Sequence, residues 1–242
     1  MQPMFHAAFP PSLRYLNAHP WFSELPAQNQ ADIAEQVYTM RANKGEVMLH
    51  AGEQVKGWYA VLSGLVKLQS QSAQGRLSVF LGVSAGEWFG EGSALKAEPR
   101  RYDVIALRDS ELMCLPLPVF EHLCAQNMSF NQALVAHLNM RLGQAMAFIE
   151  AERIRSPEQR VALYLSPMVW RRSAQLNLSQ EELGNLVGLS RQTVNKVLKS
   201  LAQRGLVAVE FGRISILDNN GLIAFASQGT ASPDSPQSNP AM

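Results

Sequence analysis

Apolar residues recur with two different periods along the chain, and the change from one to the other divides it. Between about residues 36 and 117, short apolar runs alternate with polar residues and are separated by glycine-containing turns such as Ser63-Gly64. Alternation with a period of two is typical of strands. Beyond residue 130 the apolar spacing becomes three and four, as in amphipathic helices. The pattern predicts an α+β chain in which an antiparallel β-roll precedes a helical region.

The two ends of the chain show neither period. Residues 1–22 contain Pro10-Pro11 and Pro20, and we expect them to form a loosely ordered N-terminal arm. Residues 227–242 are rich in serine, proline and glutamine and lack apolar anchors, which is typical of a disordered tail.

The most informative helical pattern lies in residues 179–201. Ser179 and Glu182 form a capping box, in which each side chain satisfies a free backbone amide of the other. Gly188 interrupts the first helix, and Ser190 is suited to cap a second. Two short helices joined by a three-residue turn are typical of a helix-turn-helix, whose second helix enters the major groove of DNA. The alternative is an ordinary pair of amphipathic helices with a solvated polar face.

The outward face of the second helix carries side chains that suit base and phosphate recognition. Arg191 can donate two hydrogen bonds to guanine, and the amides of Gln192 and Asn195 can pair with adenine. Lysines such as Lys196 and Lys199 suit phosphates, which position a protein without reading sequence. We expect Arg191 to be the principal base reader. The expected DNA-binding residues are Ser179, Gln180, Ser190, Arg191, Gln192, Thr193, Asn195, Lys196 and Lys199.

The flanking sequence extends this prediction to a winged helix-turn-helix domain over residues 157–226. Pro157 suits the first position of a helix that Ser156 would cap. Residues 206–209 and 214–217 are apolar runs around a turn, and they predict a two-stranded wing.

A long helix and hinge are expected over residues 130–156, between the roll and the winged domain. Apolar residues there are spaced by 4, 4, 3 and 4 positions, close to a coiled-coil seam. A single helix packed on its own domain would show the same stripe. The expected seam consists of Leu134, Leu138, Leu142, Ala145 and Ile149.

The net charge of +1 conceals an uneven distribution. Residues 1–150 contain 11 lysines and arginines against 13 acids, a net charge of −2. Residues 151–220 contain 10 lysines and arginines and 6 acids, which gives a net charge of +4. The positive charge therefore coincides with the helix pair, as neutralisation of DNA phosphates requires.

Composition argues against several other classes of protein. No run approaches the roughly 18 apolar residues of a membrane span, and no signal peptide is evident, so we expect a cytoplasmic protein. The two cysteines, Cys114 and Cys124, form no zinc or disulfide motif, and an iron–sulfur cluster would need about four. No catalytic triad, P-loop or metal-ligand cluster is present, so neither an enzyme nor a metal site is expected. His50, His122 and His137 could ligate haem by residue type only.

Three segments of the roll carry a resemblance to a known family. They are KGEVMLHAGE (44–53), YAVLSGLVKL (59–68) and AGEWFGEGSAL (85–95). In this order, and followed by the helix pair, they resemble the Crp/Fnr family of transcription regulators. The resemblance implies that residues 23–129 form a cyclic-nucleotide-binding-like effector domain. It also implies a parallel homodimer on a near-palindromic operator, with RNA polymerase as a further partner.

The resemblance also implies an effector pocket, from which this sequence departs. Arg101 and the helix start after Gly90 would hold a phosphate, and Glu91 a ribose hydroxyl. Tyr102, however, stands where the family's cyclic-nucleotide binders have Ser or Thr, and Gly92 stands where a bulky aliphatic residue is usual. Ala145-Met146 aligns with the pair of hydroxyl residues that contacts adenine in the cyclic-AMP receptor. The expected pocket residues are Gly90, Glu91, Gly92, Ser93, Arg101, Tyr102, Ala145 and Met146.

The identity of the effector therefore stays open. A cyclic nucleotide, another small molecule and no effector at all are three alternatives. A regulatory module that acts on a protein partner is a rival to the DNA-binding function, but it would not need the capped helix pair or the wing. Gln192 and Lys196 stand where the best-studied relatives have Glu and Arg, so the operator is expected to differ from theirs.

Overall fold

A computed structural model describes residues 11–72, 74–75, 77–154, 156–166, 169, 175–176, 178–210 and 213–227. The chain forms two compact units, Met1–Asn139 and Met140–Met242, which are described in turn. No helix within the described ranges is long and apolar enough to cross a bilayer.

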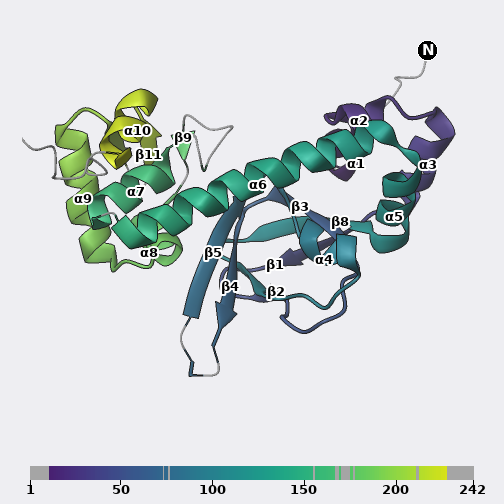
Figure 1. Ribbon diagram of the computed structural model, residues 1–242, viewed down its shortest axis with the longest axis horizontal. Coiled ribbons are helices and arrows are strands. Elements are labelled where there is room, and N and C mark those ends of the chain that lie inside the picture. Colours follow the sequence, from purple (N-terminus) through teal and green to yellow (C-terminus); the bar gives the residue numbers. More distant parts are fainter. Residues whose placement is uncertain are drawn as a thin grey trace, which may run out of the picture. The chain divides into compact units, whose positions relative to one another are not determined.

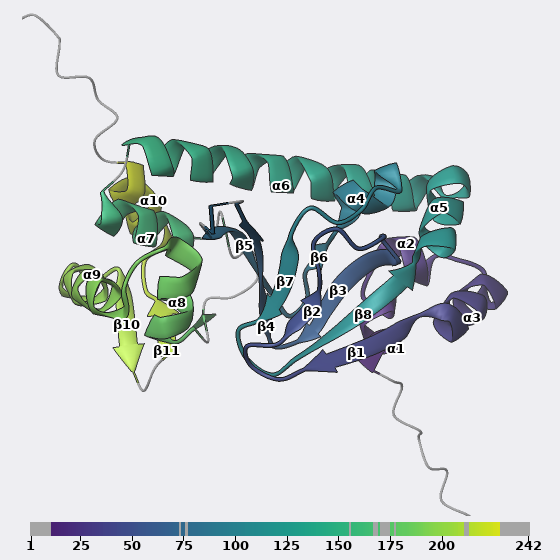
Figure 2. The same cartoon turned by 90° about the horizontal axis from the view of Figure 1, so that it is seen from below.

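The first unit is built on two four-stranded antiparallel sheets, as the alternating pattern predicted (Figures 1 and 2). One sheet has the order β1 (Tyr38–Ala42), β8 (Ser110–Pro116), β3 (Gly57–Ser63) and β6 (Trp88–Phe89). The other has the order β2 (Val47–Leu49), β7 (Asp103–Ala106), β4 (Leu65–Gln71) and β5 (Leu77–Ser84). Together they form the roll.

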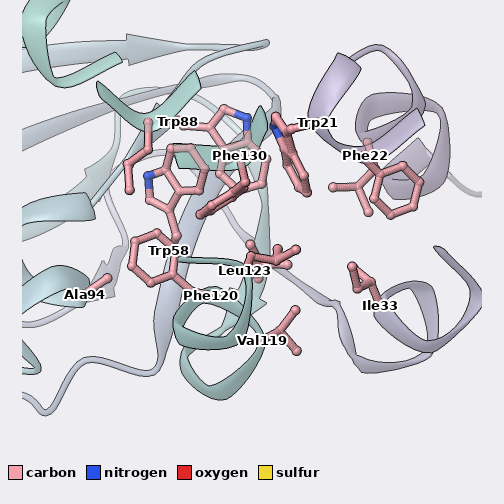
Figure 3. Packing of buried hydrophobic residues seen from close by; sticks show 14 of the residues in the cluster. Trp21, Phe22, Ile33, Trp58, Trp88, Ala94, Val119, Phe120, Leu123 and Phe130 are labelled. Atoms are coloured by element: carbon pink, nitrogen blue, oxygen red, sulfur yellow. The ribbon is translucent and has the colours of Figure 1, made fainter. Parts of the chain in front are cut away.

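Strand β3 is buried on both faces and separates two hydrophobic clusters. Trp58 and Ala60 face a cluster that the helices cover, whereas Tyr59 and Val61 face the interior of the roll. This division follows from the pleat, because successive side chains of a strand point to opposite faces. In the helix-covered cluster Trp58 stacks on Trp88, with their ring centroids 4.2 Å apart (Figure 3).

The N-terminal segment contradicts the expectation of a loosely ordered arm. Within it, residues 11–22 form α1 (Pro11–Asn17) and most of α2 (Pro20–Ser23), and they bury Leu16, Trp21 and Phe22 in the helix-covered cluster. Proline is tolerated at the first position of a helix, because the amide that it lacks would have no partner there. The prolines therefore begin helices here instead of preventing them. Residues 1–10 lie outside the described ranges.

Three further helices lie wholly within the first unit, which also contains the start of α6 (Met128–Ile154). They are α3 (Ala27–Gln36), α4 (Glu91–Lys96) and α5 (Leu117–Gln126). The helix α4 follows β6 after the single residue Gly90.

The long helix α6 spans Met128–Ile154, two residues earlier at its start than the apolar pattern predicted. Its expected seam needs one correction. Leu134 is only 3% exposed and belongs to the helix-covered cluster, and Leu138 packs against the same cluster. The neighbouring Val135 is 64% exposed. Within the described residues, the large apolar side chains that α6 exposes are Met128, Val135, Leu142, Met146 and Ile149, and the last four are spaced by 7, 4 and 3 residues. Ala145 of the expected seam is also exposed.

The second unit contains the expected helix pair and wing. Its helices are α7 (Pro157–Leu165), α8 (Gln180–Val187), α9 (Arg191–Gln203) and α10 (Asn219–Ser227). Its sheet has the order β10 (Val207–Glu210), β11 (Arg213–Ile216) and β9 (Gln175–Leu176). The helix α7 packs against α8, α9 and α10, and its Ser156 cap forms the capping box with Gln159. Neither α10 nor β9 was predicted, and the expected tail from 228 onward lies outside the described residues.

Candidate DNA-binding face and effector pocket

The helices α8 and α9 begin with the caps that their sequences predicted. The Ser179 hydroxyl accepts from the Glu182 amide at 3.1 Å, and the Glu182 carboxylate accepts from the Ser179 amide at 2.7 Å. The Ser190 hydroxyl accepts from the Thr193 amide at 3.1 Å and lies 2.9 Å from the Thr193 hydroxyl. Each cap satisfies amides that have no partner inside the helix.

The turn between the two helices depends on two glycines. Gly188 adopts a φ of 68°, the left-handed conformation that glycine enters without strain. At Gly184 a Cβ atom would lie 2.7 Å from the carbonyl oxygen of Leu189. Gly184 therefore allows the close approach of the turn to α8. The sequence pattern identified the first glycine but not the second, since nothing local marks that contact.

The helix α9 has one buried face and one exposed face. Its apolar stripe is at most 2% exposed and comprises Val194, Val197, Leu198 and Leu201. Arg191, Gln192, Lys196 and Lys199 are exposed, and Thr193 and Asn195 are half-buried. The cations of Arg191, Lys196 and Lys199 meet no carboxylate in the described part of the chain. The helix thus presents unneutralised positive charge on a rigid support.

Ser179 and Gln180 are both half-buried at the start of α8. Ser179 is committed to the cap through its hydroxyl. Its contribution to DNA binding would therefore come from the position of α8 and not from a free side chain. Gln180 is the first residue of α8, where backbone amides face outward from the helix end.

In the first unit, the start of α4 is shaped by Gly90. Gly90 has a φ of 90° and is the N-cap of α4, so only glycine fits without strain. A Cβ atom at Gly90 would lie 3.5 Å from a guanidinium nitrogen of Arg100 and 3.6 Å from the Tyr59 ring. Gly90, Tyr59 and Arg100 therefore surround one point inside the roll.

The arginine of this pocket is Arg100, and the expectation for Arg101 is wrong. The Arg101 side chain is 73% exposed and pairs with Glu98 at 2.9 Å. Arg100 is 3% exposed, and its backbone exchanges hydrogen bonds with Gly52 and Glu53. These two bonds fix the Arg100 backbone beside Gly52 and Glu53, and the Arg100 side chain is buried whereas that of Arg101 is exposed.

Arg100 carries a buried charge with no counter-ion among the described residues. Its guanidinium lies 4.9 Å from the centre of the Tyr59 ring, and one of its terminal nitrogens has no hydrogen-bond partner. Burial raises the pKa of Tyr59 far above its usual value, and burial also raises the pKa of the nearby Cys114 thiol. Both groups are therefore neutral at pH 7. Because a buried cation without an anion is costly, the interior of the roll favours an anionic ligand.

Glu91, the first residue of α4, faces α6. Its carboxylate lies 3.4 Å from the His137 imidazole, and both side chains are about one-eighth exposed, at 13% and 12%. His137 in turn packs edge-on against Trp58, with their ring centroids 5.6 Å apart. The acid expected to meet a ribose hydroxyl is thus paired with a histidine.

The remaining expected pocket residues are scattered. Gly92 is exposed with open space at its Cβ position, and Ser93 is half-buried on α4. Tyr102 packs with the roll interior and contacts Phe80 of β5 edge-on, with their ring centroids 6.4 Å apart. Ala145 and Met146 are exposed on α6 within the second unit. The structure brings together Gly90 and Arg100, of which the sequence pattern predicted only Gly90.

Metal-binding groups do not gather in the part of the chain that the structure describes. No group of three or more histidines, cysteines or acids could hold a metal ion there. Cys114 and Cys124 are free thiols, the first buried and the second half-buried.

Comparison with known proteins agrees with both units. A model of the cyclic nucleotide-binding domain matches residues 39–127, and one of the Crp-like helix-turn-helix domain matches residues 159–225. The chain is 31% identical over 195 residues to transcriptional regulator SdrP of Thermus thermophilus, covering 76% of this chain and 92% of SdrP. It is 26% identical over 168 residues to the cAMP-activated global transcriptional regulator CRP of Haemophilus influenzae, and the match covers 66% of this chain and 75% of that protein.

Solved structures show the same fold. FixK2 of Bradyrhizobium japonicum superposes with a TM-score of 0.65 at 21% identity, covering 78% of this chain and 96% of FixK2. At this identity the likeness concerns the fold alone.

Proposed function

Because the chain belongs to the Crp/Fnr family of transcription regulators, we propose that it binds a near-palindromic operator as a homodimer whose recognition helix is α9. Two-fold symmetry would place the two recognition helices roughly 34 Å apart, one turn of DNA. RNA polymerase is the partner that such a regulator would contact at a promoter.

The exposed face of α9 carries this proposal. Arg191, Gln192 and Asn195 occupy the first half of a helix whose opposite face is fully buried, so their positions are rigid. Rigid donors near the start of a groove helix read base edges, whereas Lys196 and Lys199 suit phosphates. A regulatory module that acted only on a protein partner would not need this arrangement.

The proposed dimer uses the exposed stripe of α6. Val135, Leu142, Met146 and Ile149 leave apolar surface in water on one helix, at spacings close to a heptad. Pairing with the same stripe of a second copy would bury them. Leu134 takes no part in this interface, because it lies in the core of its own unit.

The proposed signal is a small anion held by Arg100 inside the roll. The buried, unpaired guanidinium supports an anionic ligand but does not distinguish a cyclic nucleotide from another phosphate or carboxylate. The H. influenzae relative is described as cAMP-activated, so cyclic AMP is the first candidate to test. A regulator without an effector remains the alternative.

Selection of binding sites from random DNA by the purified protein tests the proposed function. We expect an enriched near-palindrome with half-sites about 10 base pairs apart, and protein of dimeric mass in the complex. Arg191→Ala should relax one base position in each half-site. Enrichment of no sequence would refute operator recognition.

Calorimetry tests the effector separately. We expect cyclic AMP or cyclic GMP, if either is the effector, to bind wild type and Arg101→Ala but not Arg100→Met. Absence of heat and of a thermal shift with both nucleotides would exclude them while leaving operator binding intact.

A further inference from the structure

A groove between α3 and α5 has no part in the DNA-binding face or in the roll pocket. Its volume is about 340 Å³. The described residues that line it are Leu25, Asn29, Asp32, Ile33, Gln36, Pro118, Val119, His122, Leu123, Gln126 and Asn127. All of them belong to the first unit.

The floor of the groove is apolar. Ile33 of α3 and Val119 and Leu123 of α5 are at most 7% exposed, and Figure 3 shows the two α5 side chains pointing toward Ile33. Leu25 and Pro118 add further apolar surface to the lining. An apolar floor between two helices can receive the apolar face of a third helix.

The rim of the groove is polar and has spare hydrogen-bonding capacity. Asn29, His122 and Gln126 are exposed, and their side chains make no hydrogen bond within the described part of the chain. A partner could therefore bond them without displacing an internal contact. Asp32, also on the rim, is bonded only within α3, by the Gln28 side chain.

The two segments that form the groove carry charge of a single sign. Residues 20–36 and 117–129, which contain α2, α3 and α5, include no lysine or arginine. They include four carboxylates, those of Glu24, Asp32, Glu35 and Glu121. All four are exposed, and no ion pair within the described residues neutralises them. The surface thus attracts cations and repels anions, including nucleic acid.

We propose that this groove docks a basic amphipathic helix of a partner protein. Each wall is a helix of 10 residues, about 15 Å long at 1.5 Å per residue, so the groove accommodates two to three turns. Apolar anchors at i, i+3 or i+4, and i+7 of the partner would lie on the floor. Its lysines and arginines would face Asp32 on the rim and would be attracted by the exposed Glu35 and Glu121 on the same two helices.

A synthetic peptide tests the proposal with the full-length protein. The probe is a fluorescein-labelled helix of about three turns, with leucines at i, i+3, i+4 and i+7 and lysines at the remaining positions. The control peptide has the same leucines and glutamates in place of the lysines. Fluorescence anisotropy should show saturable binding of the basic peptide alone, weakening as salt is added.

Substitutions locate the binding site. Asp32→Lys reverses a rim charge, and Gln126→Trp fills the groove from its rim, so each should weaken the basic peptide at least about tenfold. Glu46→Lys makes the same change in net charge at an exposed acid that does not line the groove, and it should bind like wild type. Unchanged operator binding in every variant would show that the chain is folded.

Two other outcomes would overturn the proposal. If Asp32→Lys and Glu46→Lys weaken the basic peptide equally, or if both peptides bind equally, the attraction is a nonspecific one to an acidic protein. A change in oligomeric mass with Gln126→Trp, and no saturable peptide binding, would assign the groove to a contact between copies of this chain.

Discussion

The guanidinium carbon of Arg100 lies 4.9 Å from the centre of the Tyr59 ring, inside a roll that offers it no anion among the described residues. The Tyr59 ring offsets part of the desolvation cost of the buried cation, because a cation over an aromatic face is stabilised by about 0.5–2 kcal/mol. The remaining cost is the reason to expect a ligand there.

Replacement of Arg100 should change the stability of the ligand-free protein and the binding of an anionic ligand in opposite directions. Arg100→Met removes the buried charge and its unpaired donor, so we expect the free energy of unfolding without ligand to rise by about 1 kcal/mol. Urea unfolding followed by tryptophan fluorescence measures this change. Arg101→Ala, at an exposed side chain, should leave it unchanged. A loss of stability in Arg100→Met would mean that the arginine supports the fold and not a ligand.

Arg191 and Lys199 should affect DNA binding in different ways. Arg191→Ala is expected to cost about 1–3 kcal/mol and to relax specificity at one base position. Lys199→Ala should weaken all sequences nearly equally and reduce the salt dependence by about one counter-ion. Anisotropy titrations over a series of salt concentrations and operator variants distinguish the two. Lys96→Ala, an exposed change on α4, is the control.

The cap of α8 should support the whole helix pair. Ser179→Ala removes the acceptor for the Glu182 amide, and we expect a loss of about 0.5–2 kcal/mol in the stability of the second unit. Ser179→Asp keeps a capping oxygen and should retain most of the stability. Far-ultraviolet circular dichroism during urea unfolding provides the measurement. Equal stability of the alanine and aspartate variants would contradict the role of the cap.

Leu134 and Leu142 should behave differently although both are apolar residues of α6. Leu134→Ala opens a cavity in the helix-covered cluster and should cost about 2–5 kcal/mol without changing the mass of the assembly. Leu142→Lys places charge on the exposed stripe and should convert a dimer into monomers with little loss of monomer stability. Analytical ultracentrifugation and urea unfolding of both variants test this contrast. Dimeric Leu142→Lys protein would remove the stripe from the interface.

The cysteine thiols should react slowly in the folded protein. Burial raises the pKa of Cys114, and burial together with Glu121 raises the pKa of Cys124, so less thiolate is present at any given pH. We expect iodoacetamide at pH 8 to label both more slowly than free cysteine, with a rate that increases at higher pH. Urea should restore the ordinary rate. Rapid labelling of Cys114 in the native protein would contradict its burial.

Local signals in the sequence determined the helix-turn-helix almost completely. Caps, turns and apolar stripes depend on residues three or four positions apart, and Ser179, Glu182, Gly188 and Ser190 carry them within one short segment. The strands of the roll were visible for the same reason, since alternation is a property of neighbouring residues. Helix α10 was not predicted, although the Asp218 carboxylate caps its start by accepting from the Gly221 amide at 2.8 Å. Its opening residues, Asp218-Asn219-Asn220-Gly221, are equally typical of a turn.

Tertiary contacts decided which of two neighbouring residues is buried and which is exposed. Arg100 and Arg101 are chemically identical, and only the pairing of the Arg100 backbone with Gly52 and Glu53, nearly 50 positions away, turns the first inward. Leu134 and Val135 are both apolar, and only packing of α1, α2 and α5 around the helix-covered cluster buries the first. A sequence states which residues could fill a site, whereas the direction of each side chain depends on long-range backbone contacts that no local pattern contains.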